Sequence, residues 1–182
     1  MTNPKLPEET RGLRARLRRA SNGWLKGMRA GLFLLAVYTL TFHTPVVRGS
    51  SMMPGLQDGD RILVEPWTDL FGYERGDVAV LRYPLDPTVD YVKRVIGLPG
   101  DRVVLGGGRL WVNGELIDEP YVENIDPSAF LSTIVDDGSF FVLGDNRPRS
   151  SDSREFGQVD AQLMRGRVEL RMWPLSRVGF LD

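Results

Sequence analysis

Apolar positions along the chain form one long uncharged run, followed by many short runs. The long run covers residues 30–47, which include 18 positions without a formally charged side chain. An α-helix of that length extends about 27 Å, close to the thickness of the hydrocarbon core of a bilayer. The pattern predicts one N-terminal transmembrane helix. Pro45 is expected to end it, because proline lacks the backbone N–H that a helix interior requires.

After residue 47 the apolar runs become short and rich in β-branched and aromatic residues, which is typical of strands. Seven runs predict strands, namely residues 61–64, 78–83, 91–96, 102–105, 110–112, 140–143 and 168–173. The pattern therefore predicts a mainly β domain over residues 48–182, a partly open β-barrel or sheet that follows the transmembrane helix.

Turn residues separate these runs. Asn113-Gly114 predicts a tight hairpin, and the three glycines at 106–108 predict another turn. Residues 160–164 form the one stretch with the pattern of a helical turn. Residues 121–138, rich in Asp, Pro and Ser, are expected to form the longest loop.

Charge is distributed unevenly around the long apolar run. Residues 1–29 carry eight basic and two acidic residues, a net of +6, whereas residues 48–182 carry 15 basic and 22 acidic residues, a net of −7. A basic flank favours the cytoplasmic side of a membrane. We therefore expect a basic cytoplasmic segment at 1–29, an anchor at 30–47 and an extracytoplasmic domain at 48–182. The overall net charge of −1 gives no reason to expect nucleic acid as a partner.

Two other interpretations of residues 30–47 are open. A cleaved secretory signal also begins with basic residues and an apolar stretch, and a buried helix of a soluble protein is the third option. The basic segment is long for a signal, and no clean small-x-small site follows the apolar run. These observations favour an uncleaved anchor.

The inventory of reactive side chains is small. The chain has no Cys and one His, which excludes thiol nucleophiles and multi-His metal sites. His43 lies inside the predicted anchor, so a Ser-His-Asp triad is excluded as well. Neither a metal nor an organic cofactor is expected.

A serine paired with a lysine is the nucleophilic arrangement that the inventory leaves. A neutral lysine can accept a proton, whereas arginine stays charged. Residues 48–182 contain 14 Arg and a single Lys, Lys93, within a predicted strand. Alternation places Tyr91, Lys93 and Val95 on one face, which indicates a desolvated amine. The alternative is a lysine at a strand edge with its amine in water.

At this point four blocks of the sequence resemble the type I signal peptidases, membrane-anchored Ser-Lys endopeptidases with a β-rich fold. The blocks occur in the order of that family, at residues 49–54, 75–80, 91–101 and 141–154. Two further stretches fit: residues 110–121, which include Glu119-Pro120-Tyr121, and residues 166–175. The resemblance spans the predicted anchor and nearly all of the β domain.

The resemblance implies a role for individual residues. Ser51 would be the nucleophile, Lys93 the general base, and Ser150 would orient the Lys93 amine by a hydrogen bond. The Ser51 backbone N–H would contribute to the oxyanion hole. Some members supply a second donor from a serine where this chain has Gly49, so that donor is open. Asp145, Asp152 and Arg154 would be supporting charges. Met52, Met53 and Tyr91 would line the substrate cleft.

The chain departs from the family pattern in the last block, where Pro148-Arg149 replaces the more usual Asp-Asn. The stretch between Asp101 and Phe140 is short, so the large accessory β domain of some members is expected to be absent. Three acidic residues in this stretch, Glu115, Asp118 and Glu119, are expected to form a solvated edge.

The resemblance implies a single-pass protein of the plasma membrane, the inner membrane where a cell has two. It would remove signal peptides from secretory preproteins near the translocase, through an acyl-enzyme. Substrates would carry small side chains at the first and third positions before the cut and would pair with an exposed strand edge. Two alternatives remain: a Ser-Lys protease with another processing substrate, such as a self-cleaving repressor, and an inactive membrane-tethered β module.

Overall fold

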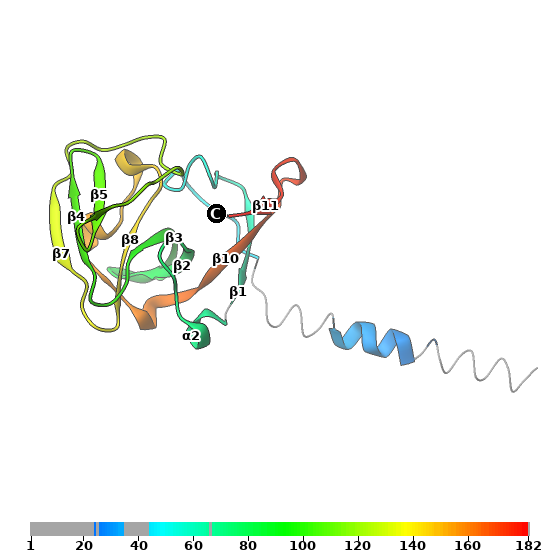
Figure 1. Ribbon diagram of the computed structural model, residues 1–182. Helices are drawn as coiled ribbons and strands as arrows, with labels where there is room; N and C mark the ends of the chain where they lie inside the picture. The colour runs from blue at the N-terminus through cyan, green and yellow to red at the C-terminus, as the bar shows by residue number, and fades with distance from the viewer. Residues whose placement is uncertain (1–23, 25, 35–43, 66, 182) are drawn as a thin grey trace, which may run out of the picture. The chain divides into compact units, whose positions relative to one another are not determined.

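The computed structural model describes residue 24 and residues 26–34, 44–65 and 67–181, in two separate units that divide after residue 41. In the first unit, residue 24 and residues 26–34 are helical (Figure 1). Their side chains are exposed. The predicted anchor at 30–47 includes residues 35–43, which lie outside the described residues. Among the residues that are described, no helix is both long and apolar enough to span a membrane.

The second unit is mainly β, as predicted, and its larger sheet has seven antiparallel strands (Figure 1). The strands are β1 (Arg61–Glu65), β2 (Val78–Tyr83), β3 (Asp86–Gly97), β8 (Ser139–Leu143), β9 (Val159–Asp160), β10 (Met164–Trp173) and β11 (Gly179–Phe180). Their order is β1-β10-β2-β3-β8-β9, and β11 also pairs with β10. The long strands β3 and β10 flank β2 at the centre of the sheet.

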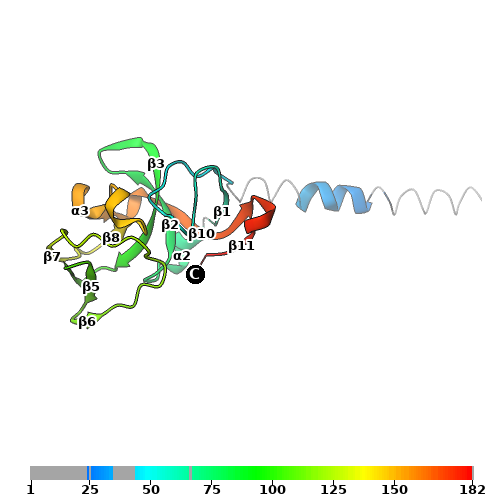
Figure 2. The same cartoon turned by 90° about the horizontal axis from the view of Figure 1, so that it is seen from above.

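A smaller antiparallel sheet is built from the stretch between the third and fourth sequence blocks. It contains β4 (Arg102–Gly106), β5 (Arg109–Val112), β6 (Glu115–Leu116) and β7 (Leu131–Ile134), in the order β6-β5-β4-β7. Both views place this sheet on the side of β8, away from β1 and β11 (Figures 1 and 2). Asn113 and Gly114 have φ values of 54° and 88°, which confirms the predicted tight turn between β5 and β6.

All seven predicted strands are present, but the loop and helix predictions were partly wrong. Strand β7 interrupts the predicted loop at 121–138. Besides the predicted turn, which is η2 (Ala161–Leu163), the described residues include four short helices: α2 (Thr68–Phe71), η1 (Arg147–Arg149), α3 (Ser153–Phe156) and η3 (Leu175–Arg177). Helices of three or four residues are too short to produce a helical period in the sequence.

The core of the second unit positions the loop before β1 and the strand β3. Met52 and Leu56 from the loop pack with Val64, Val80 and other apolar residues of β1, β2 and β10. A second cluster joins β3 and β8 to the small sheet, and a third lies where β2, β3 and β8 meet β9 and β10. Buried apolar surface stabilises by about 25 cal/mol per Å², so both segments are held firmly.

Candidate active site

The loop that carries Ser51 is fixed by two buried apolar residues that follow it, Met52 and Leu56. Met52 and Leu56 are 2% and 1% exposed, and the Leu56 N–H donates to the Met52 carbonyl at 2.8 Å. Ser51 is half-buried between them and the cleft, whereas Met53 is 37% exposed. The apolar neighbours thus enter the core and the hydroxyl stays accessible.

Two arginines near the C-terminus donate hydrogen bonds to backbone carbonyls of the same loop. Arg177 donates to the carbonyls of Pro54 and Gly55, both at 3.3 Å, and pairs with Asp60 at 3.1 Å. Arg171 also donates to the Gly55 carbonyl. Sequence reasoning missed this support, because these partners are more than 100 residues apart along the chain.

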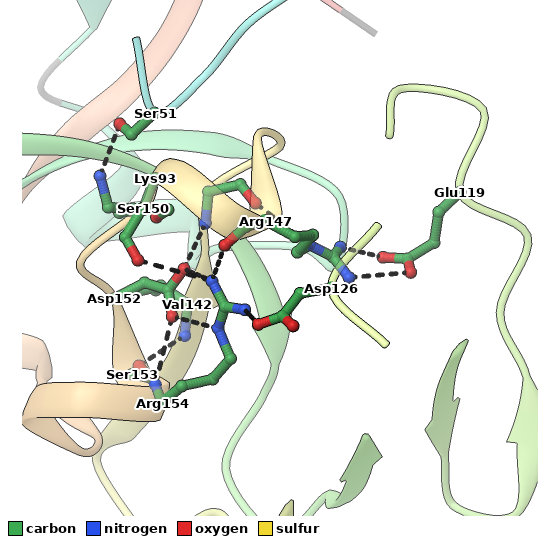
Figure 3. A network of polar contacts seen from close by, with 11 residues as sticks. Ser51, Lys93, Glu119, Asp126, Val142, Arg147, Ser150, Asp152, Ser153 and Arg154 are labelled. Carbon is green, nitrogen blue, oxygen red and sulfur yellow. Dashed lines mark hydrogen bonds and ion pairs between the residues drawn. The ribbon is translucent and has the colours of Figure 1, made fainter. Parts of the chain in front are cut away.

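Lys93 lies on β3 opposite Ala79 of β2 and is 3% exposed. Its Nζ atom is 2.8 Å from Ser51 Oγ (Figure 3). The same atom is 3.0 Å from the Val92 carbonyl oxygen. The same atom lies 5.0 Å from the centre of the Tyr91 ring. The predicted shared face of Tyr91 and Lys93 is confirmed, and the alternative of a strand-edge lysine with its amine in water is wrong.

The environment of Lys93 favours a neutral amine. Burial lowers the pKa of Lys93 to about 8, and the negative charges of Asp152 and Asp145 oppose part of that shift. A neutral amine can accept a hydrogen bond and then a proton from the Ser51 hydroxyl. Near pH 8 a substantial fraction of the protein therefore has a base in contact with a hydroxyl.

Ser150 reaches the site, but the hydrogen bond that sequence reasoning expected is not formed. A Cβ atom added to Gly144 would lie 2.2 Å from Ser150 Oγ and 2.6 Å from the Ser51 carbonyl oxygen. Ser150 therefore packs against Gly144 beside Ser51. Its Oγ atom is buried and has no hydrogen-bond partner within the described part of the chain.

Asp152 and Arg154 organise the segment around Ser150 (Figure 3). The buried Asp152 carboxylate accepts from the Gly144 N–H at 3.0 Å and from two guanidinium nitrogens of Arg154 at 2.8 Å. It also accepts from the Arg154 N–H and caps α3. Arg154 donates to the carbonyls of Arg147 and Ser150 at 2.6 and 3.5 Å.

Asp145 and Asn146 connect this segment to β3 and to the Ser51 loop. Asp145 accepts two hydrogen bonds from the Arg94 guanidinium, at 3.0 and 2.9 Å, in a pair whose side chains are 2% and 4% exposed. The Asn146 N–H donates to the Ser51 carbonyl at 2.9 Å, and its side chain donates to the Ser50 carbonyl at 3.1 Å. Asp145 was expected as a supporting charge and makes these contacts, whereas Arg94 and Asn146 were not singled out from the sequence.

Glu119 was expected on a solvated edge, and that prediction was wrong. Its side chain is 10% exposed and pairs with Arg147, whose side chain is 5% exposed, at 2.5 Å. The ion pair connects the segment after β6 to the η1 turn. Arg147 follows Glu119 by 28 residues along the chain, so the local sequence around Glu119 gave no indication of this pairing.

A cleft of about 380 Å³ opens beside Ser51 and Lys93. Met52 and Tyr91 line it, as expected, whereas Met53 is not among the lining residues. Three charged residues also border the cleft, namely Arg48, Asp90 and Arg149. This volume lies within the range of about 300–1,000 Å³ that is common for ligand pockets.

Gly49 is the position at which the sequence left the second oxyanion donor open. Its φ of 89° lies in the left-handed region that favours glycine. Its N–H donates to Asp58 Oδ1 at 2.8 Å, so that amide already has a partner. Gly49 therefore offers neither a hydroxyl nor a free N–H to the cleft.

The geometry is that of a nucleophile next to a base. A hydroxyl activated by an adjacent amine can form a covalent acyl intermediate. Within the described part of the chain, no group of three or more His, Cys, Asp or Glu side chains is arranged to hold a metal ion.

Comparisons with known proteins identify relatives over most of the chain. Residues 22–173 match the family described as "Signal peptidase, peptidase S26". Signal peptidase IB of Staphylococcus aureus is 36% identical over 168 residues, covering 80% of this chain and 84% of the relative. Signal peptidase I of Bacillus caldolyticus is 38% identical over 154 residues, covering 76% and 84%. A signal peptidase I structure from Enterococcus faecalis V583 matches with a TM-score of 0.48 and 32% identity, covering 52% of this chain and 95% of that one.

Proposed function

The chain belongs to the signal peptidase family, peptidase S26, and is a serine endopeptidase of the signal peptidase I type, and on that premise we propose that Ser51 and Lys93 carry out its chemistry. One observation carries the assignment. The buried Lys93 amine, whose pKa burial lowers to about 8, lies 2.8 Å from the Ser51 hydroxyl. Its substrates are preproteins that carry signal peptides.

In the proposed reaction, Ser51 Oγ attacks the carbonyl carbon of the scissile bond while Lys93 Nζ takes the hydroxyl proton. The resulting ammonium then protonates the leaving amine, and an acyl-enzyme remains on Ser51. A water molecule, deprotonated by the regenerated neutral Lys93, then attacks the ester. The Lys93 ammonium returns this proton to Ser51 Oγ as the bond to Ser51 breaks and the signal peptide is released. The Ser51 backbone N–H would stabilise the oxyanion of each tetrahedral intermediate.

Ser150, Asp145, Asp152 and Arg154 are proposed as supporting residues. The contact of Ser150 with Gly144 beside Ser51 supports a role next to the Lys93 amine. The buried, unpartnered Ser150 hydroxyl would orient that amine when substrate binds. The Asp152–Arg154 and Arg94–Asp145 pairs would hold the segment in place around it.

The cleft is proposed to hold the substrate as an extended segment. Tyr91 and its neighbours on β3 line one side of the cleft, and residues of the Ser51 loop line the other. An extended chain between them can pair with exposed backbone, with Met52 and Tyr91 limiting the side chains that fit. Small residues at the first and third positions before the cut are expected.

We also propose that residues 30–47 anchor the protein in the plasma membrane. The uncharged run and the basic segment before it support a single-pass topology, with residues 1–29 in the cytoplasm and residues 48–182 on the other side. This arrangement would hold Ser51 at the membrane surface, close to the translocase, where preproteins emerge. Protease added to spheroplasts should remove the β domain and leave the N-terminus intact, whereas the opposite pattern would refute the topology.

Cleavage of a preprotein tests the catalytic assignment. Purified full-length protein, in detergent or lipid, is incubated with a preprotein bearing an Ala-x-Ala site, beside Ser51→Ala and Lys93→Met. Mass spectrometry of the products should show cleavage after the final Ala by the wild type only, with circular dichroism confirming that the variants fold. Cleavage by a folded Lys93→Met variant would refute the mechanism. Absence of cleavage by the wild type across several lipids and preproteins would favour another processing substrate or an inactive protein.

A further inference from the structure

The segment Glu119-Pro120-Tyr121 follows β6 and contacts two arginines from different parts of the fold. Glu119 accepts from Arg147 Nη2 at 2.5 Å and from Nη1 at 3.2 Å (Figure 3). The Tyr121 ring lies 3.8 Å from the Arg94 guanidinium carbon, in a cation–π contact. The Tyr121 hydroxyl donates to Glu119 Oε1 at 3.0 Å. One acidic residue and one aromatic residue thus connect Arg94 to Arg147.

Each of the two arginines is next to a part of the active site. Arg94 follows Lys93 on β3, donates to Asp145 twice and donates to the Gly76 carbonyl at 2.7 Å. Its side chain therefore fixes the backbone that carries Lys93.

Arg147 begins the η1 turn, and Ser150 directly follows that turn. Arg147 Nε donates to the Gly144 carbonyl at 3.1 Å. Gly144 is the residue that packs against both Ser150 and the Ser51 carbonyl. Arg147 therefore holds the turn on which the contacts of Ser51 depend.

The ion pairs are buried to a degree that stability alone does not explain. The side chains of Arg94 and Asp145 are 4% and 2% exposed, and those of Arg147 and Glu119 are 5% and 10% exposed. Burying charges costs most of the free energy that their attraction returns, and apolar replacements are often as stable. What such pairs do supply is defined geometry, since the bidentate contact of Glu119 with Arg147 fixes both distance and orientation.

We propose that Glu119 is a positioning residue for catalysis, which acts with Tyr121 to hold Lys93 and the Gly144–Ser150 turn in register with Ser51. The inference rests on the proposed catalytic assignment of Ser51 and Lys93. Glu119 touches neither of them and acts through Arg147 and, by way of Tyr121, through Arg94.

Kinetics of the full-length protein in lipid provide the first test. Glu119→Gln keeps the shape of the side chain and removes its charge. A displacement of reacting groups by ~1 Å costs on the order of 100-fold in rate, so kcat should fall by about 10- to 100-fold with KM little changed. Tyr121→Phe, which removes one hydroxyl and keeps the ring over Arg94, should lower kcat by about threefold. Glu115→Gln is the matched control, because Glu115 is an exposed carboxylate on β6, and its kcat should equal that of the wild type.

The second test does not depend on cleavage. The chain has three lysines, Lys5, Lys26 and Lys93, so ¹³Cε-lysine NMR gives three signals, and Lys93→Met identifies the third. In Glu119→Gln the Lys93 signal should titrate at higher pH than in the wild type, because looser packing admits water to the amine. Glu115→Gln should leave the titration unchanged. If the wild type proved inactive, the catalytic proposal would fail, and this titration would still report on the positioning.

Two outcomes would overturn the proposal. The first is a folded Glu119→Gln variant with wild-type kcat and wild-type titration of Lys93. The second is a variant whose kcat returns to the wild-type value at temperatures well below its melting temperature, with unchanged titration of Lys93. That result would mean that Glu119 contributes to stability alone. If Glu119→Gln does not fold, Tyr121→Phe decides, and wild-type kcat together with wild-type titration in that variant would refute the role.

Discussion

Lys93 Nζ lies 2.8 Å from Ser51 Oγ, although 42 residues separate the two along the chain. Two independent features of the core create this contact. Met52 and Leu56 fix the Ser51 loop against β1 and β2, and the pairing of β3 with β2 and β8 sets the height of Lys93. The proposed catalytic pair is therefore brought together by the fold itself.

Replacing Lys93 by arginine should abolish cleavage even though the positive charge is retained. Arginine does not lose its proton at any pH at which the protein is folded, so it cannot accept the proton of Ser51. We expect Lys93→Arg to lose about 100- to 10,000-fold in kcat/KM, which is the range that general-base catalysis contributes. Lys93→Arg turnover within tenfold of the wild type would show that another group acts as the base.

The pH dependence of cleavage should report the neutral fraction of Lys93. Burial lowers the pKa of this amine to about 8, and the protonated form below that pH cannot act as a base. The logarithm of kcat/KM should therefore rise with pH at unit slope and level off above about pH 8. Measurements with a short peptide of constant charge avoid titration of the substrate. A midpoint near 10.5, the ordinary lysine value, would contradict the assignment of Lys93 as a desolvated base.

Lys93 should also destabilise the folded protein at neutral pH. Its folded-state pKa of about 8 is below the ordinary value of 10.5, so between these pH values the unfolded chain binds more protons. The contribution of Lys93 to stability therefore rises with pH through this window, and below about pH 8 the buried ammonium carries its full penalty. Lys93→Met removes the penalty and should raise the free energy of unfolding by up to about 3 kcal/mol at pH 7.

Urea denaturation of wild type and Lys93→Met checks this sign. The difference between the two should shrink from pH 7 to pH 10, because the wild-type amine loses its proton while all other groups are shared. A control variant at an exposed position, Arg102→Met, should show no such change. A difference that grows with pH would mean that Lys93 is stabilised in its charged form.

Local sequence patterns predicted the parts of this protein that depend on local physics. Alternation along residues 91–96 identified both the strand and the face that Lys93 shares with Tyr91, because burial of that strand follows from its own side chains. The Ser51 assignment came from the four ordered blocks, because its immediate neighbours are also compatible with an ordinary turn.

Long-range pairs could not be predicted in the same way. The local sequence around Glu119 predicts an exposed side chain, yet Arg147, 28 residues later in the chain, pairs with it and buries it. Arg94 and Asp145 are separated by 51 residues, and only the antiparallel pairing of β3 with β8 brings them together. The predicted hydrogen bond from Ser150 to Lys93 is not formed, and the sequence does not specify how Ser150 packs against Gly144.

Gly144 is a position at which a single methyl group should disrupt the site. A Cβ atom there would lie 2.2 Å from Ser150 Oγ and 2.6 Å from the Ser51 carbonyl oxygen, well inside contact distance. Gly144→Ala must therefore move the Ser150 turn, the Ser51 loop or both. We expect a loss of about 100-fold in kcat/KM, together with about 1–3 kcal/mol of stability from overpacking.

Gly55→Ala is the matched control for this prediction. Gly55 lies in the same loop as Ser51, but its added Cβ would be 3.6 Å from the Met52 carbonyl oxygen and 3.8 Å from Asp145 Oδ2, which are ordinary contacts. Its activity and melting temperature should stay close to those of the wild type. Comparing the two variants separates the loss of a glycine from the specific collision. Equal activity in Gly144→Ala and Gly55→Ala would mean that the close packing of Gly144 against Ser150 and the Ser51 carbonyl is not required for the reaction.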